Sequence, residues 1–174
     1  MPPRTRQTFQ QQLDAVEEEL QNHARLVMRA LDRAMQALLS GDEQLADTVI
    51  AGDDENDAAF ARIEDGVVRL LALQTPLATD LRLILAMLHI NLHLERMGDQ
   101  CVNIAKLTKL TLNLMIASEL LESFQKMGEQ AEAMTEEAMT AFAERNAERG
   151  ERLVTMDSVK FTSVALPNPA AAIF

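Results

Sequence analysis

One long helical pattern constrains the fold of this chain more than any other feature. Residues 76–106 read PLATDLRLILAMLHINLHLERMGDQCVNIAK, with no glycine before Gly98. Apolar residues recur every seven positions at Leu81, Leu88 and Val102, which is the spacing of a helix face that packs against other helices. Alanine, leucine, methionine and glutamate are abundant and aromatic residues make up only 3% of the chain, a composition that favours helices. The chain is therefore expected to be an all-α protein.

Acidic residues stand on this helix where the pattern asks for leucine. Glu95 completes the seven-residue line of Leu88 and Val102. Asp99 follows it one turn later, on the neighbouring line of Leu85 and Leu92. A carboxylate on a face that packs against a core is costly unless it is paired or binds a cation. Both residues are therefore candidate ligands.

The preceding helical segment, expected over residues 42–74, repeats this anomaly. Asp53 lies seven residues before Phe60, and Asp57 lies seven before Glu64, so both aspartates follow the lines of the apolar face. That face consists of Ile50, Phe60, Val67 and Leu71. The segment therefore supplies a second pair of inward acids.

An antiparallel hairpin around Thr75 would bring the two acid pairs together. Asp53 and Asp57 would then lie level with Glu95 and Asp99, with no Lys or Arg between them on the inward lines. Unscreened carboxylates at such range repel one another. Hard cations, whose natural ligands are carboxylate oxygens, are the simplest relief.

Three strings in the same region carry a family resemblance. They are D-x-x-x-D at residues 53–57, LALQTPLATDLR at residues 71–82 and ERMGDQCVNIAK at residues 95–106. On these strings the chain resembles the PhoU family of phosphate-uptake regulators, from residue 8 to about residue 157. The resemblance implies two three-helix repeats, each with a multinuclear metal site on E/D-x-x-x-D motifs. It implies iron or zinc as the metal, with magnesium or manganese as alternatives, and the ligands Asp53, Asp57, Glu95, Asp99 and Asn103.

The resemblance also implies a function. PhoU proteins are cytoplasmic negative regulators of the phosphate-starvation response and are not enzymes. They connect a phosphate ABC transporter, through its ATPase, to a phosphate-sensing histidine kinase, and a homodimer is expected. Any membrane association would come through these partners. The residues independently favour a non-catalytic protein, because the sequence has no phosphate-cradling glycine-rich loop and no nucleophile beside a base.

Two other functions remain open from the residues. One is a metal-free helical interaction module, whose weakness is four inward acids without a basic partner. The other is a carboxylate-bridged metal oxidase, which needs Glu-x-x-His pairs. Neither His89 nor His93 follows a glutamate by three residues, and both are expected on the outer face of their helix.

Charge and hydropathy exclude two further classes. The net charge of −11 repels nucleic-acid phosphates, and the scarcity of aromatic residues removes platforms for base stacking. The apolar runs are interrupted by Arg82, His89 and Asn91, so no segment is expected to span a membrane.

The first helix is predicted from a heptad line that contains one histidine, His23, which is expected at the core or its boundary. The line consists of Phe9, Leu13, Val16, Leu20, His23, Val27, Ala30, Ala34 and Leu38. Gly41 suits a left-handed C-cap. The next helix is expected to start either with a capping box of Ser40 and Glu43 or with Asp42 as N-cap.

An internal repeat then begins and stops. Phe124, Ala131, Ala138 and Phe142 echo the first helix at an offset of 104 residues, but Phe161 stands where the echo of Asp57 would fall. The expected domains are a first three-helix repeat at 8–115, a partial second repeat at 116–157 and an irregular tail at 158–174. The fold class is therefore an antiparallel three-helix bundle repeat with an incomplete second repeat. The uncovered face of the helix at 118–145 predicts self-association.

Overall fold

Every secondary-structure element in the described part of the chain is a helix, which confirms the all-α prediction. The computed structural model describes residues 3–73 and 78–156. The predicted helix start at Thr75 and Pro76 and the predicted tail at 158–174 lie outside these residues. The helices are α1 (Pro3–Ser40), α2 (Glu43–Ala51), α3 (Asp53–Leu73), α4 (Ala78–Thr111), α5 (Ser118–Ala143) and α6 (Ala147–Met156).

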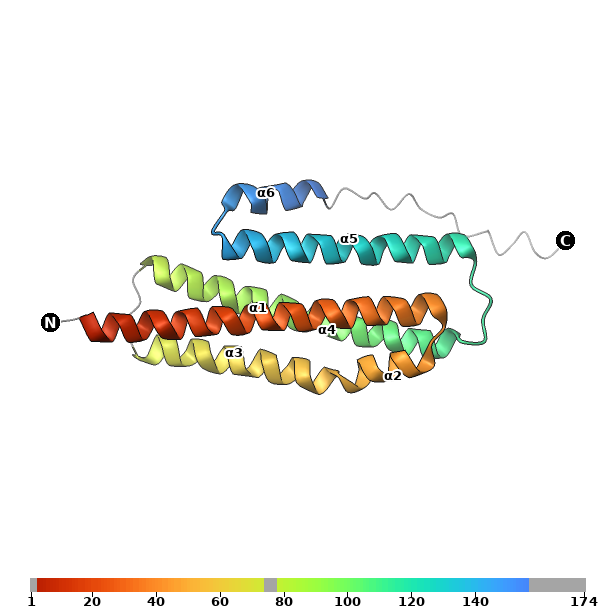
Figure 1. The fold of residues 1–174 in the computed structure, drawn as a ribbon, viewed down its shortest axis with the longest axis horizontal. Helices are drawn as coiled ribbons and strands as arrows, with labels where there is room; N and C mark the ends of the chain where they lie inside the picture. Colours follow the sequence, from red (N-terminus) through yellow and green to blue (C-terminus); the bar gives the residue numbers. More distant parts are fainter. Residues whose placement is uncertain (1–2, 74–77, 157–174) are drawn as a thin grey trace, which may run out of the picture. The chain divides into compact units, whose positions relative to one another are not determined.

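The chain divides into two compact units, residues 1–135 and residues 136–174. In the first unit α1 packs lengthwise against α3 and α4, and α4 also packs against α2 (Figure 1). Helices α2 and α3 follow one another along the same side, so the bundle has three rods with alternating direction (Figure 1). This is the predicted antiparallel three-helix bundle. No described helix is long and apolar enough to cross a membrane.

The predicted core face of α1 is confirmed along its whole length. All nine residues of the heptad line are buried except Ala30, which is half-buried. His23 lies in this core and is only 1% exposed. The burial of apolar side chains such as Leu20 and Val27 supplies the main driving force for packing α1 into the bundle.

The turn after α1 follows one of the two predicted capping schemes. Gly41 has a φ of 66°, the left-handed conformation expected of a C-cap. Asp42 is the N-cap of α2, and its carboxylate accepts a hydrogen bond of 3.0 Å from the Leu45 amide. The capping box of Ser40 and Glu43 is wrong, because the Ser40 hydroxyl donates instead to the carbonyl of Gln36.

The predicted helix at 42–74 is interrupted at Gly52. The Gly52 amide is shared between the carbonyls of Thr48 and Val49, at 3.1 and 3.2 Å, a pattern that is common where a helix ends. Because glycine has a low helix propensity, the helix is interrupted at Gly52. The interruption makes Asp53 the first residue of α3.

The predicted core faces of α3 and α4 are partly wrong. Leu71 on α3 is 40% exposed. On α4, Leu81, Leu85 and Leu92 are 38%, 43% and 46% exposed. The core residues of α4 are Ile84, Met87, Asn91, Leu94, Gly98, Cys101, Val102, Ala105 and Thr108. Those of α3 are Asn56, Ala59, Ile63, Val67 and Leu70. The error arises because apolar residues occur on both sides of α4, so seven-residue spacing alone did not select the buried side.

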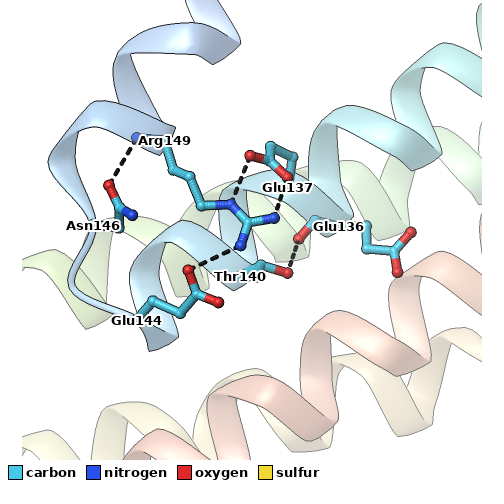
Figure 2. Close-up of polar contacts among 6 residues, drawn as sticks. All are labelled: Glu136, Glu137, Thr140, Glu144, Asn146 and Arg149. Atoms are coloured by element: carbon cyan, nitrogen blue, oxygen red, sulfur yellow. Dashed lines mark hydrogen bonds and ion pairs between the residues drawn. The ribbon is translucent and has the colours of Figure 1, made fainter.

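The second unit contains the end of α5 and all of α6. The Arg149 guanidinium donates two hydrogen bonds of 2.8 Å to the Glu137 carboxylate and one of 2.9 Å to Glu144 (Figure 2). The Asn146 side chain accepts from the Arg149 amide at 3.0 Å. These bonds join the first turn of α6 to the last turns of α5, and they lower the pKa of Glu137. The predicted repeat boundaries stay a prediction.

Candidate metal centre

Two neighbouring helices carry the four candidate carboxylates. Asp53 opens α3 and Asp57 follows one turn later, while Glu95 and Asp99 lie one turn apart on α4. Helices α3 and α4 pack against each other. The two acid pairs therefore meet, as expected, where α3 packs against α4. We call this place, with its four acids, the acid seam.

The acids lie on the flank of the bundle and not in its core. Asp57 and Asp99 are exposed, whereas Asp53 and Glu95 are half-buried. Asn103, one turn beyond Asp99 on α4, is exposed as well. The expectation of a core-facing side chain is wrong for Asp57 and Asp99, whereas Asp53 and Glu95 lie at the boundary of the core.

The carboxylates nevertheless interact across the seam. The pKa of Asp53 is raised first by burial and then by the charges of Asp57 and Asp99. The pKa of Glu95 is likewise raised by burial, then by Asp99 and Asp57, while Arg96 opposes the rise. Each half-buried acid is thus influenced by acids from both helices. The seam is a place of unfavourable negative charge.

Two lysines of α4 act on acidic residues of the neighbouring helices. The charge of Lys106 lowers the pKa of Asp53, although not enough to cancel the rise. Further along α4, Lys109 binds Asp47 of α2 and lies 3.7 Å from Glu43. Lys106 forms no ion pair with Asp53 among the described residues, and one carboxylate oxygen of Asp53 has no hydrogen-bond partner there. Lys109 ties α2 to α4 beside the acid seam.

The acid seam meets only part of what a metal ion requires. The Asp53 Oδ1 atom is buried and has no hydrogen-bond partner among the described residues, and an orphaned carboxylate oxygen is a suitable ligand for a hard cation. Against this, the described part of the chain contains no three His, Cys, Asp or Glu side chains gathered closely enough to hold one ion. The oxygens suit a cation in chemistry, but they are spread along the seam.

Other candidate ligands lie away from the seam or are chemically unsuited. His89 and His93 are exposed on α4, as predicted. Cys101 is buried, and burial raises the pKa of its thiol to about 11. A thiol with this pKa is protonated at neutral pH and is a poor metal ligand.

A buried polar cluster beside the seam was not foreseen from the sequence. His23 of α1 lies 2.9 Å from Asn91 of α4 through its Nδ1 atom and 2.9 Å from Asn56 of α3 through its Nε2 atom. The Asn91 amide nitrogen donates to the carbonyl of Phe60 at 3.0 Å. The available signal was that all three polar residues interrupt apolar faces. Of the three, only His23 was placed in or beside the core from the sequence.

Comparison with known proteins gives a consistent result. The PhoU domain family matches residues 20–108, just over half of the chain. The PhoU homolog of Clostridium acetobutylicum, a phosphate-specific transport system accessory protein, is 32% identical over 88% of this chain and 70% of its own length. The protein of the same name from Aquifex aeolicus is 41% identical over 55% of this chain and 43% of its own length.

Solved structures agree. The crystal structure of PhoU from Pseudomonas aeruginosa matches with a TM-score of 0.81 and 29% identity, over 86% of this chain and 71% of that one. The phosphate transport system regulatory protein PhoU from Streptococcus pneumoniae matches with a TM-score of 0.78 and 29% identity, over 86% of this chain and 70% of that one. The similarity thus includes sequence, domain and fold. The chain belongs to the PhoU family.

Proposed function

We propose that this protein is a non-enzymatic accessory regulator of phosphate transport that binds metal at the α3–α4 seam. The family membership supports the regulatory part, since the relatives are named as phosphate-specific transport system accessory proteins. The observation that carries the metal site is that four carboxylates from two helices lie along one seam, where the charges of Asp57 and Asp99 help to raise the pKa values of the half-buried Asp53 and Glu95.

Metal binding would require only local rearrangement of the seam. Asp57 and Asp99 are exposed, so their side chains can rotate toward Asp53 and Glu95 without disturbing the core. Asn103 would add a neutral oxygen ligand one turn beyond Asp99. A bound cation would offset the repulsion between the acids, and carboxylate and amide oxygens suit iron, zinc, magnesium or manganese to different degrees.

The same face of α4 offers a surface for protein partners. Leu85 and Leu92 share a seven-residue line with Asp99, and both are more than two-fifths exposed. Exposed leucines beside charged groups are typical of protein-binding surfaces. We propose that this surface serves the cytoplasmic phosphate transporter ATPase and a phosphate-sensing histidine kinase, which would bring the protein to the membrane. Self-association as a dimer is a separate proposal, through the face of α5 from which the sequence predicts it.

A binding experiment tests the regulatory role. The purified protein would be mixed with the ATPase subunit of the phosphate transporter and, separately, with the cytoplasmic part of the histidine kinase encoded in the same genome. Binding that is weakened by Leu85→Asp with Leu92→Asp is expected. The matched control is Val68→Asp with Leu114→Asp, which adds the same charge at two exposed apolar positions outside α4. Absence of binding to both partners would contradict the proposal.

One observation favours a second function, a helical interaction module without metal. The side chains described by the structure include no compact group of three metal-binding residues, and Lys106 partly relieves the charge on Asp53. Under this function the protein would bind the same partners, and addition or removal of divalent metal would leave that binding unchanged. Partner binding measured with and without EDTA separates the two functions.

A further inference from the structure

A layer of buried polar side chains crosses the bundle, with one residue from each rod. It consists of His23 of α1, Asn56 of α3 and Asn91 of α4, which are 1%, 6% and 0% exposed. The two distances of 2.9 Å between the His23 ring nitrogens and the two asparagine side chains are those of well-formed hydrogen bonds. The rest of the α1 core line is apolar, so this layer is a distinct feature of the bundle.

The hydrogen bonds in the layer run in one direction. Because Asn91 Nδ2 donates to the carbonyl of Phe60, its Oδ1 accepts from the Nδ1–H of His23. With Oδ1 of Asn56 toward Nε2 of His23, the Nδ2 atom of Asn56 is buried without a partner among the described residues. Turning this amide lets Nδ2 donate to Nε2 of a neutral ring, and hydrogen bonding decides such orientations. The chain then runs from Asn56 through His23 and Asn91 to Phe60.

The same asparagine sets how closely α3 and α4 approach. A Cβ atom added to Gly98 would lie 2.2 Å from Nδ2 of Asn56, a distance at which one of them must move. The Asn56 side chain therefore occupies the space that a larger residue at Gly98 would fill. With its amide turned, Oδ1 would face the Cα–H of Gly98, which is a weak hydrogen-bond donor.

This close contact lies between the two acid pairs. Asn56 stands between Asp53 and Asp57 along α3, and Gly98 stands between Glu95 and Asp99 along α4. A change in the spacing or register of the two helices at this point would therefore move all four carboxylates relative to one another. An apolar layer would supply packing here but no directional bond, whereas buried polar residues are known to fix the register of packed helices.

We propose that the His23–Asn56–Asn91 layer positions the acid seam, acting through the Asn56–Gly98 contact to hold α3 and α4 at the spacing that cation binding requires. His23 and Asn91 touch none of the four acids in this arrangement and act only through Asn56 and the helix backbones. The proposal rests on the metal site proposed above. It concerns a positioning role and adds no ligand to that site.

The main test replaces the whole layer with apolar residues, His23→Leu, Asn56→Val and Asn91→Leu together, so that no polar group is left unpaired. Mn²⁺ binding would be followed by electron paramagnetic resonance. A folded variant whose affinity for Mn²⁺ falls about 10–100-fold, the range seen when groups that orient metal ligands are lost, supports the proposal. A folded variant that binds Mn²⁺ as the wild type does would overturn it.

A second readout does not depend on metal. Nitroxide labels would be attached at Ala61→Cys on α3 and His89→Cys on α4, both exposed positions. Pulsed electron paramagnetic resonance then measures the distance between the labels, which reports the separation of the two helices. Buried Cys101, whose thiol has a pKa of about 11, is expected to escape labelling. A broader or displaced distance distribution in the apolar variant is expected, and an unchanged distribution would contradict the positioning role. If the wild type binds no Mn²⁺, the metal proposal fails, and these distances alone then test whether the layer fixes the spacing of α3 and α4.

A single substitution keeps the test open if the triple variant does not fold. Gly98→Ala would push against Asn56, and Gly66→Ala is its matched control, because its Cβ would lie 2.7 Å from Cγ2 of Val16, an apolar side chain outside the polar layer. Loss of Mn²⁺ affinity in Gly98→Ala alone supports the proposal. Equal affinities in the two folded variants would overturn it.

Discussion

Removing two carboxylates from the acid seam is expected to stabilise the metal-free protein. Asp57 and Asp99 are exposed, and the charge of each raises the pKa of both Asp53 and Glu95. Each exposed charge pair is worth only a few tenths of a kcal/mol, so relief of these repulsions in Asp57→Asn with Asp99→Asn amounts to about 1 kcal/mol. For a chain of this size, such a gain corresponds to a rise in Tm of about 2–4 °C.

Thermal unfolding in EDTA at low salt, followed by circular dichroism, measures this gain. The control is Glu64→Gln with Glu122→Gln, which removes the same charge from exposed positions outside the seam. The difference between the two double variants should shrink in high salt, because salt screens exposed charges. The reasoning is refuted if the seam variant melts at or below the temperature of the wild type while the control is unchanged.

Three further predictions concern the described bundle. The pKa values of Asp53 and Glu95 are raised in the folded state. The stability that these acids contribute is therefore greatest below their unfolded pKa values of about 4, and it is lost as the pH rises through their folded pKa values. Urea unfolding in EDTA from pH 4 to 7 should show this decline, and Asp53→Asn with Glu95→Gln should reduce it. Ile84→Ala, at a fully buried position, should lower the free energy of unfolding by about 2–5 kcal/mol, whereas Leu85→Ala, at a 43% exposed one, should change it by about 0.5 kcal/mol; equal losses in chemical denaturation would mean that the core face of α4 is assigned wrongly. Cys101, with a thiol pKa of about 11, should react with a disulfide reagent at neutral pH only after denaturant is added, and rapid labelling of the native protein would contradict its burial.

The sequence was a good guide wherever one face of a helix differs clearly from the other. On α1 the heptad line interleaves with charged residues, and the predicted core face was confirmed. On α4 it was not, because Ile84 and Leu85 are both apolar and only one of them is buried. A helix that packs against several neighbours has a wide apolar surface, and spacing alone cannot divide it into core and flank.

For the candidate site as well, local sequence pattern identified the residues, but their exposure depended on how the helices pack. The two acid pairs could be identified from D-x-x-x-D and E-x-x-x-D spacing, and the hairpin between their helices brought them together. Their exposure was missed, since it depends on how α3 and α4 turn toward α1. The partners of His23 were missed as well. Asn56 is 33 positions and Asn91 is 68 positions from His23 in the sequence, and hydrogen bonds over such separations leave no mark on local periodicity.

Metal content is the most direct test of the central claim that the four acids at the α3–α4 seam form a cation site. Protein purified without chelator would be analysed for iron, zinc, magnesium and manganese, next to Asp57→Ala with Asp99→Ala, whose fold would be verified by circular dichroism. We predict at least one bound metal ion per wild-type chain and almost none in the folded variant. Equal metal content in the two proteins, or none in the wild type even after incubation with each metal, would contradict it.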